Sequence, residues 1–280
     1  MTKPDSHSFN ETGDGFSLYN PRLIDRAAFD LWNDSFCVKV DQKGTVEGSV
    51  YTPNGQPYAE NLRPVYCVDR DTGSHWSLSW GPVFKDPEVF SFDIHLNHVS
   101  WRQEYKGIAS TLSVAVPREG HLEAWRLILA NNSSDKRHLQ ITPAIPTGLL
   151  GLLDQESHIA ENPFGVRHDY FPYYVKIPDY DKMARRWNTT FLYPDKKPDS
   201  WTALERDFLG FGGWAAPRGL ATDSLGYQHC HYERGIFALR YAVELQPHEI
   251  FTLNWIMGPA RSAEHARDVA GRYPPETAFD

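Results

Sequence analysis

Apolar and polar side chains alternate along much of the chain, which is the pattern of strands that bury one face. In residues 36–51, Phe36, Val38 and Val40 fall on one face and Lys39 on the other. A glycine turn then leads into a second alternating run. This segment predicts two antiparallel strands joined by a tight turn.

Further strand pairs are predicted downstream. Residues 108–116 alternate in the same way, and residues 122–130 and 138–145 are two such runs joined by an Asn/Ser/Asp turn. Residues 235–258 repeat this arrangement around a Gln-Pro-His-Glu turn. Residues of these types favour turns because they accept left-handed backbone or bond to nearby backbone groups. Such regular strands predict an all-β antiparallel sandwich.

Two segments predict short helices. Pro21–Trp32 has apolar residues at helical spacing, and proline suits an early helix position; these apolar residues are Leu23, Ala27 and Leu31. Ser262–Tyr273 begins with a residue suited to a helix start and ends before Pro274 and Pro275, which stop a helix.

The composition fits a packed protein and excludes some partners. The chain has 280 residues, of which 41% are hydrophobic and 23% charged, enough for one large β domain. The net charge is -8 and the pI is about 5.8, and no basic block is present. An acidic balance of this kind argues against binding to nucleic acid or to an anionic membrane surface.

The order of segments predicts three parts: a flexible N-terminus over residues 1–15, one domain over residues 16–273, and a tail or linker over residues 274–280. Residues 1–15 lack the apolar core of a signal peptide. No window reaches the roughly 18–20 apolar residues of a spanning helix. We therefore expect a cytoplasmic protein whose three cysteines are reduced thiols.

The best candidate for ligand recognition is the stretch at residues 162–175, within a region (155–200) rich in Pro, Tyr and Asp with little alternation. Long excursions on a sheet scaffold often carry binding residues. Its aromatic rings suit the C–H faces of sugars, and its polar groups suit hydroxyls. Subunit contact is an equal alternative, since aromatic residues and arginine also mark interfaces. The candidates are Phe164, Arg167, His168, Asp169, Tyr170, Phe171 and Tyr173.

Other constellations favour structural roles. A cluster at residues 229–233 has His and Cys side chains but lacks obvious further ligands for zinc, so surface histidines at a strand end are the simpler interpretation. Glycoside hydrolysis needs two facing carboxylates. Its candidates cannot be paired from sequence; they are Asp93, Glu104, Asp169, Glu205 and Asp207. We expect no catalytic residue, no metal and no cofactor.

Six stretches in order resemble one known family. The run YCVDRDTGSHWSLSW at 66–80 resembles the N-terminal domain of glycoside hydrolase family 94, formerly glycosyltransferase family 36, which includes cellobiose and chitobiose phosphorylases. The other stretches that are similar to this family lie at 17–34, 104–117, 123–141, 198–220 and 244–273. The resemblance implies a galactose mutarotase-like β-supersandwich. Two stretches depart from the family pattern, HLNHVSW at 95–101 and AIPTGLLG at 144–151.

In that family the domain precedes a helical linker and a catalytic (α/α)6 barrel with the general acid and the phosphate site. The chain ends at Asp280, so the resemblance implies that the barrel is absent. Our first hypothesis is a carbohydrate-binding, non-catalytic domain or subunit that completes the active site of a separate barrel chain or holds a homodimer. Its ligand would be a β-linked disaccharide or oligosaccharide. The alternatives are a stand-alone sugar hydrolase, lyase or epimerase, and a purely structural packing domain.

Overall fold

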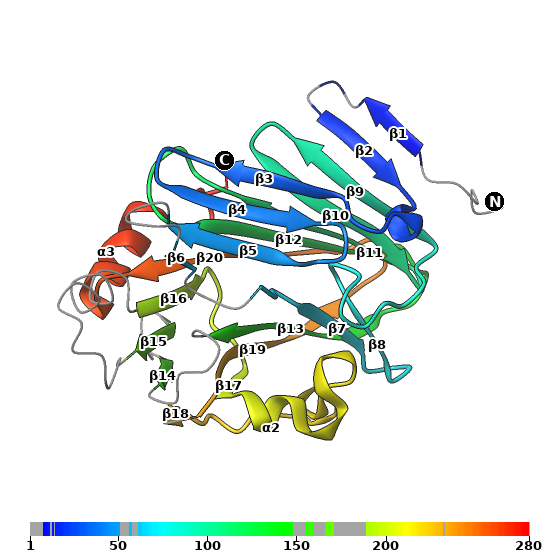
Figure 1. The fold of residues 1–280 in the computed structure, drawn as a ribbon. Coiled ribbons are helices and arrows are strands. Elements are labelled where there is room, and N and C mark those ends of the chain that lie inside the picture. Colours follow the sequence, from blue (N-terminus) through cyan, green and yellow to red (C-terminus); the bar gives the residue numbers. More distant parts are fainter. Residues whose placement is uncertain are drawn as a thin grey trace.

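A computed structural model describes residues 8–11, 13, 15–50, 56–57, 61–147, 155–159, 166–170, 189–231 and 233–279. Most of these residues lie in antiparallel strands of three sheets (Figure 1). The large sheet has eleven strands. In spatial order they are β1 (Ser8–Glu11), β2 (Gly15–Tyr19), β9 (Val89–His95), β10 (His98–Tyr105), β11 (Ile108–Ala115), β12 (Glu123–Asn131), β20 (Ile250–Ala260), β16 (Thr189–Pro194), β15 (Val166–Tyr170), β14 (Gln155–Ile159) and β18 (Cys230–His231).

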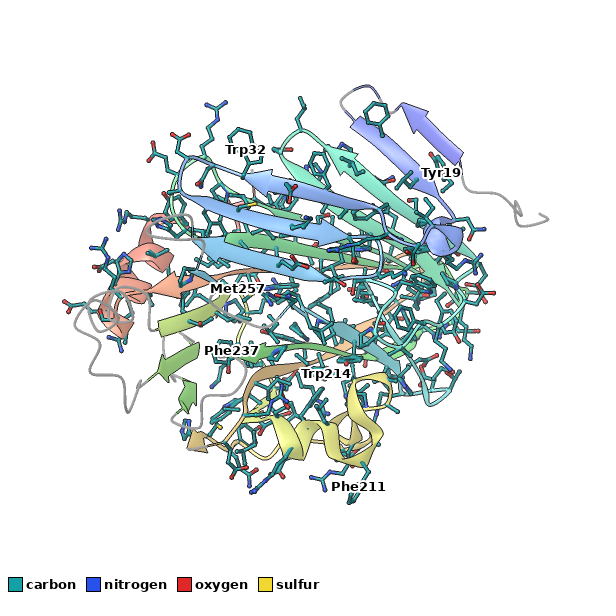
Figure 2. All side chains as sticks on the ribbon, in the orientation of Figure 1. Tyr19, Trp32, Phe211, Trp214, Phe237 and Met257 are labelled. Carbon is teal, nitrogen blue, oxygen red and sulfur yellow. The ribbon has the colours of Figure 1, made fainter. Side chains whose placement is uncertain are left out.

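Two smaller sheets pack on one face of the large sheet. The five-stranded sheet has the order β17 (Ser200–Leu204), β19 (Gly235–Leu245), β13 (Arg137–Thr147), β7 (Val65–Asp69) and β8 (Ser74–Ser77). The four-stranded sheet has the order β3 (Ala28–Trp32), β4 (Phe36–Asp41), β5 (Val46–Val50) and β6 (Gln56–Pro57). One hydrophobic cluster contains side chains from all three sheets, so the core lies between them (Figure 2). This arrangement confirms the predicted all-β sandwich.

A row of three tryptophans marks the centre of the core. The rings of Trp101 and Trp125 stack with centroids 6.0 Å apart, and those of Trp125 and Trp255 stack at 5.5 Å. The Trp125 indole N–H donates to Glu123 Oε2 at 2.8 Å. Glu123 in turn forms a 3.2 Å ion pair with Arg63, and both side chains are buried. Aromatic packing and a compensated buried charge thus meet at the start of β12.

Each strand of the five-stranded sheet has two different faces. In β19, Leu239, Tyr241 and Val243 point into the core, as alternation requires. Arg240 and Ala242 therefore lie on the outer face of this sheet. That outer face is where a second, smaller cluster of buried residues forms.

Short helices cover parts of the sheets. They are η1 (Pro21–Leu23), α2 (Glu205–Leu209), η2 (Gly210–Ala215), η3 (Arg218–Ala221) and α3 (Ala263–Arg272). The segment from α2 to η3 packs on the outer face of the five-stranded sheet, where Phe208 and Leu220 join the smaller cluster (Figure 1). Helix α3 packs on the large sheet, and Ser262 caps it by accepting a bond from the His265 amide at 3.1 Å. The predicted C-terminal helix is therefore confirmed.

The predicted helix at Pro21–Trp32 is wrong. Only the 3-10 turn η1 forms there, and residues 28–32 become strand β3, which pairs with β4 from Ala28↔Asp41 to Trp32↔Cys37. The same residues also alternate, because Leu31 is buried while Asp30 and Trp32 are exposed. Pairing with β4 and burial of Leu31 outweigh the weak local preference for helix.

The other strands predicted from the sequence are present in the structure. The runs at 36–51, 122–145 and 235–258 contain the strands β4 and β5, β12 and β13, and β19 and β20. Of the three expected pairs, β4–β5 forms, whereas β12 pairs with β11 and β20, and β13 pairs with β7 and β19. The turns after β12 and β19 therefore lead from one sheet to the other, so these two pairings are wrong. Residues 8–11, within the predicted N-terminal segment, pair with β2. The tail residue Phe279 packs over the Arg126 guanidinium at 4.7 Å. No helix among the described residues has both the length and the apolar composition of a membrane span.

Candidate functional site

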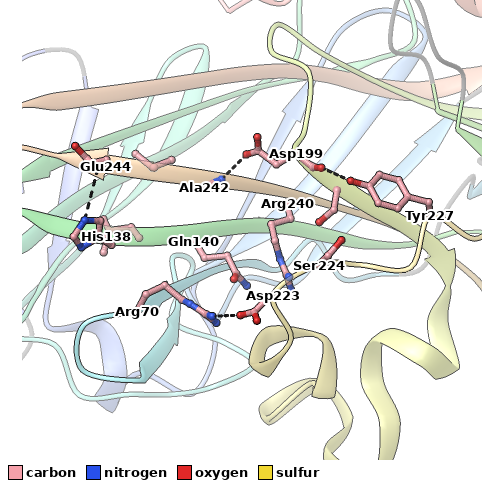
Figure 3. A pocket seen from close by; sticks show the side chains of 13 residues that line it. Arg70, His138, Gln140, Asp199, Asp223, Ser224, Tyr227, Arg240, Ala242 and Glu244 are labelled. Carbon is pink, nitrogen blue, oxygen red and sulfur yellow. Dashed lines mark hydrogen bonds and ion pairs between the residues drawn. The ribbon is translucent and has the colours of Figure 1, made fainter.

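A cavity of about 530 Å³ opens on the outer face of the five-stranded sheet, where the segment from α2 to η3 leaves β13 and β19 uncovered (Figure 3). We call it the sheet-face pocket. Its lining includes Arg70, Gln140, Asp223, Tyr227 and Arg240. These residues come from the end of β7, from β13, from the loop after η3 and from β19. The pocket therefore depends on the pairing of strands that are distant in sequence.

Arg240 forms the floor of the pocket. Its side chain is almost fully buried, and Nη1 donates to the Thr222 carbonyl at 2.7 Å while Nη2 donates to the Gly219 carbonyl. The Gln140 amide is best oriented with its oxygen toward Arg240, because it then accepts from Nε at 3.0 Å and from Nη2 at 3.1 Å. Arg240 thus fixes the turn at 219–222 on the sheet.

Burial and the nearby Arg70 charge lower the pKa of Arg240 to about 10, and Asp223 opposes this shift. The guanidinium is therefore still charged at neutral pH. Its charge is met mainly by carbonyl oxygens, and the floor of the pocket is a fixed positive group.

The rim of the pocket carries an exposed ion pair between Arg70 Nη2 and Asp223 Oδ1 (Figure 3). The Asp223 side chain is 93% exposed and that of Arg70 is 37% exposed. Exposed pairs of this kind contribute at most about 1 kcal/mol. The rim can therefore open at low energetic cost, while the floor stays fixed.

An aromatic wall stands on the opposite side. Tyr227 is half exposed, and its hydroxyl donates to the Asp199 carbonyl at 2.5 Å. Its ring packs edge-on against Trp201, with centroids 5.7 Å apart. The Asp199 carboxylate accepts from the Ala242 amide at 2.7 Å, which ties the wall to β19. A held ring with an open face suits stacking on a sugar.

Hydrogen-bond donors and acceptors complete the site. His138 Nδ1 lies 2.8 Å from Asp71, and His138 Nε2 lies 3.6 Å from Glu244. The His138 backbone amide also donates to Asp71, and bonds from His138 lower the pKa of that carboxyl. The pocket thus offers donors, acceptors and an aromatic face with nearly balanced charge. This chemistry suits a polyhydroxylated ligand better than a strongly charged one.

The candidates at 164–173 are only partly placed. Arg167, His168, Asp169 and Tyr170 lie in β15, whose backbone pairs with β14 and β16 in the large sheet. Phe164, Phe171 and Tyr173 lie outside the described residues. The sheet-face pocket is on a different sheet. Sugar or subunit contact by these seven residues stays a prediction.

Three of the five carboxylates considered for hydrolysis are engaged in ion pairs. Asp93 lies 3.1 Å from Arg102, and Glu205 lies 3.1 Å from Arg234. Asp207 lies 3.7 Å from Arg218. These contacts support the structural interpretation of the carboxylates.

The cluster at residues 229–233 also has structural contacts. The buried Cys230 thiol donates to the Glu233 carbonyl at 3.2 Å, and burial raises its pKa to about 11. A protonated thiol is a poor metal ligand. The His229 ring packs on Trp201 at 5.0 Å. In the part of the chain that the structure describes, no group of three or more potential ligands is arranged to hold a metal.

Sequence reasoning missed the sheet-face pocket. One signal was present: Arg240 interrupts the apolar run GIFALRYAVEL, which is unusual for a strand buried on both faces. Its partners are Gly219 in η3 and Thr222 directly after it, and the position of η3 on the sheet could not be derived from local pattern.

Comparisons with known proteins place this fold in a family. The family described as glycosyl hydrolase 94, supersandwich domain, matches residues 54–275. Cellobionic acid phosphorylase of Neurospora crassa is 26% identical, over 96% of this chain and 36% of the relative. A 3-O-beta-D-glucopyranosyl-beta-D-glucuronide phosphorylase of Paenibacillus borealis is 27% identical, over 95% of this chain and 35% of the relative.

The chain thus spans about a third of the length of these curated relatives. A solved structure assigned as a kojibiose phosphorylase from the human microbiome superposes with a TM-score of 0.60 at 10% identity, over 99% of this chain and 37% of that one. At this identity the structural match supports the fold alone. Because the family match covers most of the sequence, the chain belongs to the glycosyl hydrolase 94 supersandwich-domain family.

Proposed function

We propose that this chain is the carbohydrate-recognising, non-catalytic domain of a family 94 type disaccharide phosphorylase. The observation that carries the proposal is the family match over residues 54–275 in a chain about a third as long as its phosphorylase relatives. Its role would be to bind and orient a β-linked sugar and so complete the active site of a separate catalytic (α/α)6 chain, or to hold a homodimer together. Orientation and exclusion of water can supply a large part of a rate enhancement.

The sheet-face pocket supports carbohydrate as the ligand. It combines an exposed tyrosine ring with donors and acceptors of nearly balanced charge, and Asp93, Glu205 and Asp207 among the carboxylates considered for hydrolysis are held in ion pairs. The two relatives described above each have an acidic sugar in their names, so we include such sugars among the candidate ligands. Phosphorolysis consumes inorganic phosphate, which favours a cytoplasmic location.

The test is calorimetry of the purified chain with cellobiose and cellobionic acid in phosphate buffer, with sugar 1-phosphate assayed in the same samples. Binding without turnover is the expected result. Turnover would contradict the non-catalytic assignment and favour a stand-alone sugar enzyme. The absence of both would favour a packing domain. Light scattering of the same sample measures whether the chain forms a dimer.

A further inference from the structure

A second cavity, of about 390 Å³, lies on the other side of η3 from the sheet-face pocket. We call it the η3 pocket. Its lining includes Val68, His75, Pro217 and Ala221, so it is less polar than its neighbour. Arg70 lines both cavities. The two cavities therefore adjoin at one side chain.

Strand register places the two floors in one line. His75 pairs with Val68, Val68 pairs with Gln140, and Gln140 pairs with Ala242, across β8, β7, β13 and β19. The first two residues line the η3 pocket and the last two line the sheet-face pocket. Neighbouring strands lie about 4.8 Å apart, so this row extends over roughly 14 Å. The cavities follow each other along a line that crosses the strands.

The Arg70–Asp223 pair and η3 lie at the border of the cavities, because Arg70 lines both, Asp223 lines the first and residues of η3 line the second. The turn behind them is fixed, because Arg240 holds the carbonyls of Gly219 and Thr222. The pair itself is exposed and contributes little to stability. A ligand hydroxyl that bonds to Arg70 or Asp223 can replace it without disturbing the sheet.

We propose that the two cavities are adjacent subsites of one groove that binds a β-linked oligosaccharide across Arg70. This inference rests on the proposed carbohydrate function and adds the length and direction of the ligand. One sugar stacks near Tyr227 in the sheet-face pocket, and the chain continues over Val68 toward His75. The C–H face of the second sugar packs on the apolar lining around Val68 and Pro217. The Arg70 guanidinium donates hydrogen bonds to hydroxyl oxygens between the two sugar units.

The experiment compares binding of glucose, cellobiose, cellotriose and cellotetraose to the intact chain by calorimetry and ligand-observed NMR. A second subsite adds contacts without a second loss of ligand translational freedom. We therefore expect the affinity to rise about tenfold or more from the shortest to the longest sugar that binds. Equal affinity for all lengths would overturn the two-subsite inference and leave the proposed function standing. No binding at any length would overturn both.

Matched tyrosine substitutions assign the subsites. Ala221→Tyr fills the η3 pocket and Ala242→Tyr fills the sheet-face pocket, and both alanines are exposed. Ala28→Tyr, on an exposed position of the four-stranded sheet, is the control. We expect Ala221→Tyr to abolish the gain with length while short-sugar affinity stays within about twofold. We expect Ala242→Tyr to weaken binding of every sugar. If Ala221→Tyr behaves like the control and remains folded by circular dichroism, the η3 pocket is not a subsite.

Discussion

Replacement of Glu123 by alanine should remove most of the stability of this domain. Glu123 compensates the buried Arg63 guanidinium and accepts the Trp125 indole N–H. Removal of one partner of a buried ion pair costs about 3–5 kcal/mol, and a buried donor left without its acceptor costs about 1–3 kcal/mol. The sum, roughly 4–8 kcal/mol, is comparable with the whole unfolding free energy of a typical domain, about 5–15 kcal/mol.

Urea unfolding followed by circular dichroism measures this loss. Two variants separate charge from shape. Glu123→Gln keeps an acceptor for Trp125 and should lose less than Glu123→Ala. The double variant Arg63→Met, Glu123→Met removes both charges, and it should be more stable than Glu123→Ala, because a buried pair can be replaced by apolar residues at little cost. A double variant no more stable than Glu123→Ala, or a loss below about 1 kcal/mol in Glu123→Ala, would refute the uncompensated-charge argument.

Three further predictions concern backbone space and titration. Gly258→Ala should lower the unfolding free energy by about 1–3 kcal/mol, because the new Cβ would overlap the His121 carbonyl oxygen. Gly271→Ala, in open space on α3, should raise the unfolding free energy by about 0.5–1 kcal/mol. Thermal unfolding of both variants checks these changes. Asp71 should titrate below its usual range in carbon-13 NMR, and stability should fall as pH drops through that pKa. His138→Ala should raise this pKa only in part, since the backbone amide still donates. Burial, followed by the charges of Arg261 and Arg272, lowers the pKa of His265. As the pH falls, this histidine is therefore protonated in the unfolded chain before it is protonated in the folded chain. The unfolding free energy should decline below about pH 6.5, and it should decline less in His265→Gln.

Many strands could be predicted because apolar and polar side chains alternate along them. The strands β12, β13, β19 and β20 have long alternating runs bounded by strong turn residues, and their predicted bounds lie within two residues of the observed ones. Their pairing partners could not be predicted in this way, because each turn leads into a different sheet. The segment 21–32 failed because its apolar spacing fits both periods, and only pairing with β4 decides between them.

The site could not be predicted in the same way. Arg70 and Asp223 are 153 positions apart, and no sequence pattern indicates that they meet. Their contact requires the order of β7, β13 and β19 in one sheet and the position of η3 on that sheet. Arg240 in the apolar run of β19 carried one signal, whereas the candidates chosen from the sequence were aromatic or charged residues in a region without alternation. Composition can indicate such a region, but it cannot select the face on which a pocket opens.

The two faces of β19 have a consequence for how this domain can diversify. Leu239, Tyr241 and Val243 hold the core, while Arg240 and Ala242 line the pocket, so stability and recognition depend on alternating positions of one strand. The Ala242 side chain lies on the face of β19 opposite Tyr241 and Val243, so a change in its size acts on the pocket rather than on the core packing. Single substitutions on the pocket face can therefore change the ligand preference of such a scaffold step by step, while the core face keeps the fold.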